Sequence, residues 1–303
     1  MQIALAAERH EQRGVRQVND RTRSPMTHMN TRQRMADGLR VRYAETDGVG
    51  DETVLLLNPW PESLFAWDTI WTRLAQTARL VAIDLPGFGQ SERKAELLSP
   101  RAMGTFLLRL IDEWGLGHPH VVGPDVGTGA VLFALSEDLD RFPSAVVGSG
   151  GASFPLEVTG ALKELIEAPD LAGFQGVDGR DIVAGALEGI ERHTLPDAVR
   201  EDYLTSYAGD RFVESAAYVR SYPSDLPILA GRLGDIRTPV QIIAGRHDTL
   251  VPPSNAEFLH ARLADSKLDI LETGHFTWED GAGDYLELTR SWIEAHRTGR
   301  SGG

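Results

Sequence analysis

The residues best suited to chemistry are Asp125, Asp248 and His275, each of which follows a short apolar run that is typical of a buried strand. Asp125 stands at the centre of a Gly-Pro-Asp-Val-Gly segment, residues 123–127, whose glycines permit a sharp turn between a strand and a helix. A carboxylate, a second carboxylate and a histidine in this order can supply a nucleophile, an orienting acid and a base. We therefore interpret the three residues as one catalytic set.

An aspartate in the nucleophile position selects the reaction. A serine that attacked a saturated carbon would leave a stable ether, whereas an aspartate leaves an ester that water can hydrolyse. Asp125 is ionised near neutral pH and needs no base to become nucleophilic. We expect Asp125 to attack an sp³ carbon and form an alkyl-enzyme ester, and His275, oriented by Asp248, to activate the water that opens it.

Short apolar runs predict the strands that must position these side chains. The predicted strands are residues 39–44, 54–57, 80–83, 120–122, 145–147, 240–244 and 268–271. Amphipathic segments lie between them, such as Pro100–Trp114, where Ser99 is expected to cap a helix. This alternation is typical of a mostly parallel sheet with helices on both faces, and it places the three reactive residues on loops at strand ends.

Residues 153–235 interrupt the alternation, because they contain helix-like pieces and no convincing buried strand. We predict that they form a helical insertion. Four of the six tyrosines of the chain fall in it, in two i, i+4 pairs: Tyr203, Tyr207, Tyr218 and Tyr222. The insertion divides an α/β core of residues 35–152 and 236–298.

The two ends of the chain are expected to lie outside this core. The first 34 residues hold seven arginines and three acidic residues, a balance of 7 − 3 = +4, and are interpreted as a disordered tail or a mis-annotated start. Residues 299–303 are expected to be frayed.

Composition narrows the function classes. Lysine and arginine number 30 against 44 aspartates and glutamates, and the net charge of −14 disfavours nucleic acid or an anionic membrane as the main partner. The chain has no cysteine, which excludes disulfides, thiolate catalysis and cysteine-ligated metals. No apolar run is long enough for a signal peptide or a membrane span, so a cytoplasmic protein is expected, and a homodimer stays open.

The turn around Asp125 resembles the nucleophile elbow of the α/β-hydrolase fold, and the order nucleophile, acid, histidine is that of the same superfamily. Two further segments are similar to its aspartate-nucleophile branch of epoxide hydrolases and haloalkane dehalogenases: Asn-Pro-Trp-Pro-Glu-Ser at residues 58–63 and Asp-Leu-Pro-Gly-Phe-Gly-Gln-Ser at residues 84–91. The resemblance covers about residues 38–298. It implies an eight-stranded, mostly parallel sheet flanked by helices, with the insertion as a cap.

The resemblance also implies an oxyanion hole and the absence of a cofactor. The backbone N–H groups of Trp60 and Val126 would form the hole, and no metal or organic cofactor is expected. One departure is that Asn58 and Pro59 stand where the branch has His-Gly. This change leaves open a non-hydrolytic or cyclase-like protein of the same fold.

The expected substrate is a small hydrophobic epoxide or halide. An epoxide oxygen needs a proton, which the resembling hydrolases take from cap tyrosines. Tyr218 stands near the expected position of one, and Tyr203, Tyr207 or Tyr222 are the other candidates.

A halide needs only N–H donors. Dehalogenases usually carry tryptophan directly after the nucleophile, where this chain has Val126, although Trp60 could present its indole N–H. The resemblance thus favours conversion of an epoxide to a vicinal diol, with a haloalkane or haloacid dehalogenase as the alternative.

Overall fold

A single twisted sheet of eight strands organises the protein in a computed structural model that describes residues 27–48, 51–174 and 176–298. The strands are β1 Thr31–Ala36, β2 Leu39–Glu45, β3 Thr53–Leu57, β4 Arg79–Ile83, β5 His120–Pro124, β6 Ala145–Gly148, β7 Val240–Gly245 and β8 Ser266–Leu271. Their spatial order is β1-β2-β4-β3-β5-β6-β7-β8. Strands β1 and β2 pair antiparallel, as do β2 and β4, and all other pairs are parallel. The expected mostly parallel sheet is confirmed.

Among the strands of the described residues, β1 is the one that no apolar run predicts. It forms a hairpin with β2 through Asp37 and Gly38, both with positive φ, a turn for which Asp-Gly is a strong signal. Residues 31–35 of β1 are exposed, so alternation of apolar and polar residues is absent there. The boundary of the predicted tail at residue 34 is therefore wrong, because residues 31–34 belong to the sheet. Residues 1–26 of that tail, and residues 299–303, lie outside the described residues.

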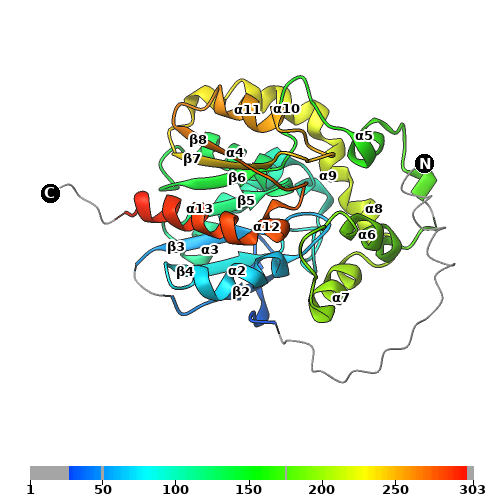
Figure 1. The fold of residues 1–303 in the computed structure, drawn as a ribbon, viewed down its shortest axis with the longest axis horizontal. Helices are drawn as coiled ribbons and strands as arrows, with labels where there is room; N and C mark the ends of the chain where they lie inside the picture. Colours follow the sequence, from blue (N-terminus) through cyan, green and yellow to red (C-terminus); the bar gives the residue numbers. More distant parts are fainter. Residues whose placement is uncertain (1–26, 49–50, 175, 299–303) are drawn as a thin grey trace.

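Helices cover both faces of the sheet (Figure 1). Outside residues 149–239 the α helices are α2 Asp68–Leu74, α3 Pro100–Trp114, α4 Val126–Glu137, α11 Ser254–His260, α12 Thr277–Asp280 and α13 Ala282–Ala295. Helices α2 and α13 pack on one face, and α3, α4 and α11 on the other. Successive residues of β3 point to opposite faces of the sheet. Leu56 packs in the core under α2 and α13, and Leu57 packs in the core under α3, α4 and α11.

Helix α3 begins and ends as the sequence predicts. The hydroxyl of Ser99 accepts the N–H of Ala102 at 3.2 Å, Pro100 is the first helical residue, and Gly115 ends the helix with φ of 65°. The buried α4 packs against it and carries apolar residues on every side.

A helical insertion, residues 149–239, separates β6 from β7 and contains no strand in its described part. Its α helices are α5 Gly160–Glu167, α6 Gly179–Leu187, α7 Asp197–Ser206, α8 Arg211–Ser215, α9 Ala217–Arg220 and α10 Tyr222–Ala230. Figure 1 shows α5 to α9 gathered on one side of the sheet, whereas α10 lies along it. The insertion agrees in position with the predicted helical segment, residues 153–235.

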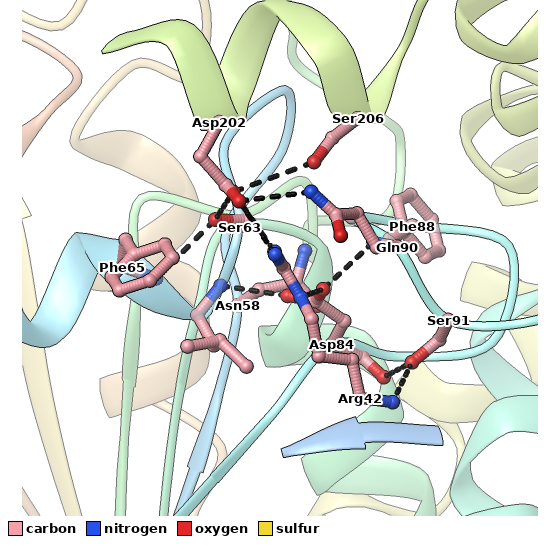
Figure 2. A network of polar contacts seen from close by, with 12 residues as sticks. Arg42, Asn58, Ser63, Phe65, Asp84, Phe88, Gln90, Ser91, Asp202 and Ser206 are labelled. Atoms are coloured by element: carbon pink, nitrogen blue, oxygen red, sulfur yellow. Dashed lines mark hydrogen bonds and ion pairs between the residues drawn. The ribbon is translucent and has the colours of Figure 1, made fainter. Parts of the chain in front are cut away.

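A buried charge cluster, Arg42, Asp84 and Asp202, joins the insertion to the sheet (Figure 2). Arg42 on β2 is 4% exposed and donates from Nε to Asp84 and from both terminal nitrogens to Asp202 of α7, at 2.6 and 2.9 Å. The hydroxyl of Ser63 donates to the same Asp202 carboxylate at 2.6 Å. Every charge in the cluster therefore has a fixed partner.

Within the described residues, no helix combines the length and the apolar character that crossing a bilayer requires.

Candidate active site

The sharp turn around Asp125 connects β5 to α4. Asp125 has φ of 51° and ψ of −121°, a conformation that residues with a side chain rarely adopt. The backbone closes around it, since Asp125 N–H donates to the carbonyl of Gly148 at 2.8 Å. A side chain at Gly123 would meet Val131 at 2.7 Å, whereas one at Gly127 would meet only ordinary contacts at 3.5 Å. Of the two flanking glycines, Gly123 is the one that close packing requires.

The carboxylate of Asp125 is buried and held by backbone donors. Trp60 N–H donates to its Oδ2 at 2.6 Å, and the N–H of the next residue, Val126, also acts to lower the pKa of the carboxyl. Burial raises the pKa of Asp125 to about 6, although the charge of His275 and these two N–H groups act to lower it. The structure thus brings the two predicted oxyanion donors onto the predicted nucleophile.

The substituted segment, residues 58–63, keeps this geometry. The Asn58 side chain is buried and accepts the N–H of Leu85 at 2.7 Å, while its amide donates to the carbonyl of Pro59 at 2.9 Å. Asn58 therefore fixes the loop that carries Trp60, and the proline at 59 leaves the Trp60 N–H available.

His275 lies between the two carboxylates. Its Nδ1 is 2.8 Å from Asp248 Oδ2, and its Nε2 is 3.7 Å from Asp125 Oδ1. Burial lowers the pKa of His275, but the charges of Asp248 and Asp125 outweigh it and raise the pKa to about 9. Asp248 is itself fixed, because its Oδ1 accepts the N–H groups of Leu250 and Val251 at 2.8 Å each.

A cavity of about 380 Å³ opens onto Asp125 and His275. The insertion and the loops of the sheet both line it, largely with apolar side chains such as Leu162, Phe212 and Phe276. Among the described residues, the acidic and histidine side chains that line it are Asp125, His275, Asp181, Glu191 and His247, and no lysine or arginine lines it. The volume suits a small organic molecule.

The four tyrosines of the insertion lie in different surroundings. Tyr222 lines the cavity, and within the described chain its hydroxyl has no hydrogen-bond partner. The Tyr218 hydroxyl donates to the Val126 carbonyl at 2.7 Å, and the Tyr207 hydroxyl donates to the Glu62 carbonyl at 2.9 Å. The Tyr203 hydroxyl donates to Glu279 at 3.1 Å. Tyr222 is thus the candidate that lines the cavity without a hydrogen bond from its hydroxyl in the described chain, whereas the Tyr218 hydroxyl is engaged by the Val126 carbonyl.

The sequence interpretation did not single out several residues around the site. Phe212 stacks on the Trp60 ring at 4.8 Å between centroids, and the Trp60 indole N–H donates to Ser215 at 2.9 Å. Glu62 and Glu279 are buried carboxyls two and four residues from Trp60 and His275. The spacing of each from a predicted site residue is the signal that could have identified them.

Among residues 27–48, 51–174 and 176–298, no three histidine, aspartate or glutamate side chains are arranged so that they could hold a metal ion.

Comparisons with known proteins agree with the fold. A sequence model described as "alpha/beta hydrolase fold" matches residues 52–282. A Klebsiella pneumoniae protein named 2-hydroxy-6-oxononadienedioate/2-hydroxy-6-oxononatrienedioate hydrolase is 26% identical over 265 residues, 81% of this chain and 88% of that protein. A soluble epoxide hydrolase from Corynebacterium sp. is 32% identical over 142 residues, 44% of this chain and 48% of that protein.

A solved structure of an alpha/beta hydrolase fold protein from Burkholderia ambifaria superposes with a TM-score of 0.74 at 22% identity, covering 87% of this chain and 99% of that one. The family match spans more than half of the chain, and the strand order and the turn at Asp125 are consistent with it. The chain belongs to the alpha/beta hydrolase fold family.

Proposed function

We propose that this hydrolase converts a small, uncharged epoxide to a vicinal diol through an ester with Asp125. The observation that carries the proposal is the carboxylate of Asp125, with Oδ2 held by Trp60 N–H and Oδ1 turned toward His275. Oδ1 is the oxygen free to attack, and Oδ2 already occupies the position where negative charge develops later.

The first step forms the ester. Asp125 Oδ1 attacks one epoxide carbon, the bond from that carbon to the ring oxygen breaks, and the oxygen takes its proton from the Tyr222 hydroxyl. Tyr222 is proposed for this role because it lines the cavity without another hydrogen-bond partner in the described chain. Its position in the helical insertion supports a role for that segment as a cap over the site.

The second step opens the ester. While Asp125 is ionised its charge helps to raise the pKa of His275, so the resting pair is an ion pair at neutral pH. Esterification removes that charge, so the pKa of His275 falls toward the range of a base and its proton passes to the Tyr222 phenolate left by the first step. His275 then takes a proton from water, the hydroxide adds to the Asp125 carboxyl carbon, and the tetrahedral oxyanion on Oδ2 is stabilised by Trp60 and Val126. Collapse expels the product alkoxide, which takes its proton from His275 and leaves as the diol. The proton of the new Asp125 carboxyl group then passes to His275 and restores the resting ion pair.

The cavity lining favours a neutral substrate. Within the part of the chain that the structure describes, its walls carry no lysine or arginine, and the exposed Asp181 and Glu191 add negative charge. A dianionic substrate, such as the dienedioate in the name of the Klebsiella relative, would meet carboxylates without a basic partner. The same argument disfavours a haloacid.

A halide leaving group has less support. The Trp60 indole N–H is engaged by the Ser215 hydroxyl, and Val126 has no side-chain donor. The soluble epoxide hydrolase of Corynebacterium supports the epoxide proposal, since its similarity covers nearly half of this chain.

The test is a single turnover in water enriched in oxygen-18. Because Asp125 Oδ1 leaves with the product, the diol of the first turnover should carry ordinary oxygen and the enzyme should gain the heavy isotope in the peptide that contains Asp125. His275→Gln should accumulate the ester, visible by intact mass. Heavy oxygen in the first diol would refute the ester.

A panel of styrene-type epoxides and bromoalkanes should give diol and no bromide. Bromide release would favour the dehalogenase alternative. A folded protein that releases neither diol nor bromide would favour a non-hydrolytic protein.

A further inference from the structure

Glu62 is a fully buried carboxyl group beside the active site. It follows Trp60 by two residues and has no exposed surface. Its Oε2 accepts the indole N–H of Trp278 at 2.7 Å, whereas its Oε1 is buried with no hydrogen-bond partner among the described residues. A buried carboxylate oxygen without a donor is costly and rare in folded proteins, so Oε1 requires an explanation.

Glu279 on α12 presents the same arrangement from the other side. It follows His275 by four residues and is 3% exposed. Its Oε1 accepts the Tyr203 hydroxyl at 3.1 Å, and its Oε2 is buried with no hydrogen-bond partner in the described part of the chain. His193 Nε2 lies 3.6 Å from this oxygen, too far for a good hydrogen bond.

One proton satisfies both of these oxygens. The two carboxyl groups are close together, since Trp278, whose indole N–H donates to Glu62, directly precedes Glu279 in the chain. If Glu62 carries a proton on Oε1 and donates it to Glu279 Oε2, then Glu62 Oε2 accepts from Trp278, and Glu279 accepts from both Glu62 and Tyr203. Burial, together with the charge of Glu279, raises the pKa of Glu62 well above its ordinary value, which agrees with this assignment.

The surroundings oppose a second negative charge on the pair. The titratable groups that act on it are Asp125, Asp68, Asp280, Tyr203 and His193. Apart from the partly exposed His193, none of these can be a cation, so ionisation of both glutamates would be unfavourable.

We propose that Glu62 and Glu279 share one proton and act as a positioning pair for the hydrolase reaction. The pair joins three parts of the site: the segment whose Trp60 N–H holds Asp125, the helix that follows His275, and helix α7 through Tyr203. Trp278, the donor to Glu62, also packs edge-on against the His275 ring at 5.9 Å between centroids. This inference rests on the proposed function for its effect on turnover, whereas the shared proton does not depend on it.

The test compares Glu62→Gln with Glu62→Leu. Glutamine supplies an N–H where the proton sits and an oxygen for Trp278, while leucine has similar size and leaves both partners unpaired. E62Q should retain turnover within about threefold, and E62L should lose about 10- to 100-fold in kcat with a smaller change in KM, the loss expected for buried groups left unpaired.

Infrared spectroscopy reads the proton directly. Wild type at neutral pH should show the carbonyl stretch of a protonated carboxylic acid, and this band should be absent in E62Q. It should also be lost in Glu279→Gln, where the amide can donate to an ionised Glu62. A band missing from wild type, or retained in E62Q, would overturn the proposal even if E62L fails to fold. If epoxides are not hydrolysed at all, the infrared result still decides the shared proton, so the two proposals fail separately.

Discussion

The active site and the Arg42, Asp84 and Asp202 cluster are both buried sets of charges, but their charges are satisfied to different degrees. In the cluster, each Asp202 oxygen accepts from Arg42, and Asp84 accepts from Arg42 and from the N–H groups of Leu64 and Gln90 (Figure 2). In the site, Asp125 Oδ2 is held by Trp60, whereas Oδ1 faces His275 at 3.7 Å and opens on a cavity.

This difference separates stability from reactivity. A buried charge with fixed partners on all sides contributes to the folded structure and has nothing left to offer a substrate. An incompletely partnered carboxylate is unfavourable in the folded protein, and that is the condition under which it can attack. The comparison predicts opposite consequences for removing a charge from the two places.

The largest expected effect is on turnover at the site. Asp125→Asn should reduce epoxide hydrolysis by about 10⁴-fold or more, because an amide is a poor nucleophile and no other group can form the ester. Diol release measures it, and peptide mapping must show that asparagine is still present. Asp140→Asn, an exposed position away from the cavity, is the matched control and should keep full activity. Residual turnover within tenfold of wild type would show that Asp125 is not the nucleophile.

The tyrosine pair of α9 and α10 gives the next effect. Tyr222→Phe should slow epoxide turnover about 100-fold, since the leaving alkoxide loses its proton donor. Tyr218→Phe removes a hydroxyl that hydrogen-bonds to the Val126 carbonyl, and it should cost about 1 kcal/mol of unfolding free energy with turnover within about fivefold. Steady-state kinetics on both variants decide the assignment. The reverse ranking would return the acid role to Tyr218.

Removing a charge from the Arg42, Asp84 and Asp202 cluster should change the stability of the fold. Asp202→Ala should lower the free energy of unfolding by about 2 kcal/mol, because the Arg42 guanidinium is left buried with one of its two carboxylate partners. Urea unfolding measures the change. Glu201 lies on the same helix as Asp202 and forms an exposed ion pair with Arg180 of α6, so Glu201→Ala should move the urea midpoint far less. Equal changes in the urea midpoint for the two variants would mean that the buried ion pair contributes no more to stability than the exposed one.

The active-site residues could be predicted from the sequence, whereas the buried charge cluster and strand β1 could not. Asp125, Asp248 and His275 could be predicted because each follows an apolar strand, and parallel strands bring their ends to one edge of a sheet. The role of Asp202 could not be predicted, because its partner Arg42 is 160 positions away and an isolated acidic residue on a helix is expected to be exposed. Strand β1 escaped detection because its side chains are polar and face solvent.

The tyrosines show another limit of sequence reasoning. The spacing of Tyr218 and Tyr222 suggested one helical face, and their rings do contact at 6.1 Å between centroids. However, α9 ends at Arg220 and α10 begins at Tyr222, with Pro223 in its first turn. The two side chains therefore have different surroundings, since the Tyr218 hydroxyl donates to the Val126 carbonyl whereas Tyr222 lines the cavity. Periodicity predicts the face of a helix, not the direction of a side-chain tip.

The smallest effect is the sharpest test of the comparison, because it predicts that removing a catalytic charge stabilises the fold. In the folded protein the pKa of Asp125 is raised to about 6 from its ordinary 3.8, so the folded state binds its proton more tightly than the unfolded chain. Stability contributed by this group is therefore lost as pH rises from about 4 through about 6. Asp125→Asn removes that loss and should be about 1 kcal/mol more stable than wild type at pH 7. The gain should shrink as pH falls toward 4, whereas Asp140→Asn should show no such trend. The prediction fails if D125N is less stable than wild type at pH 7, or if the difference in stability between the two does not change with pH. Either result would mean that the Asp125 carboxylate has hydrogen-bond and charge partners as complete as those of Asp202.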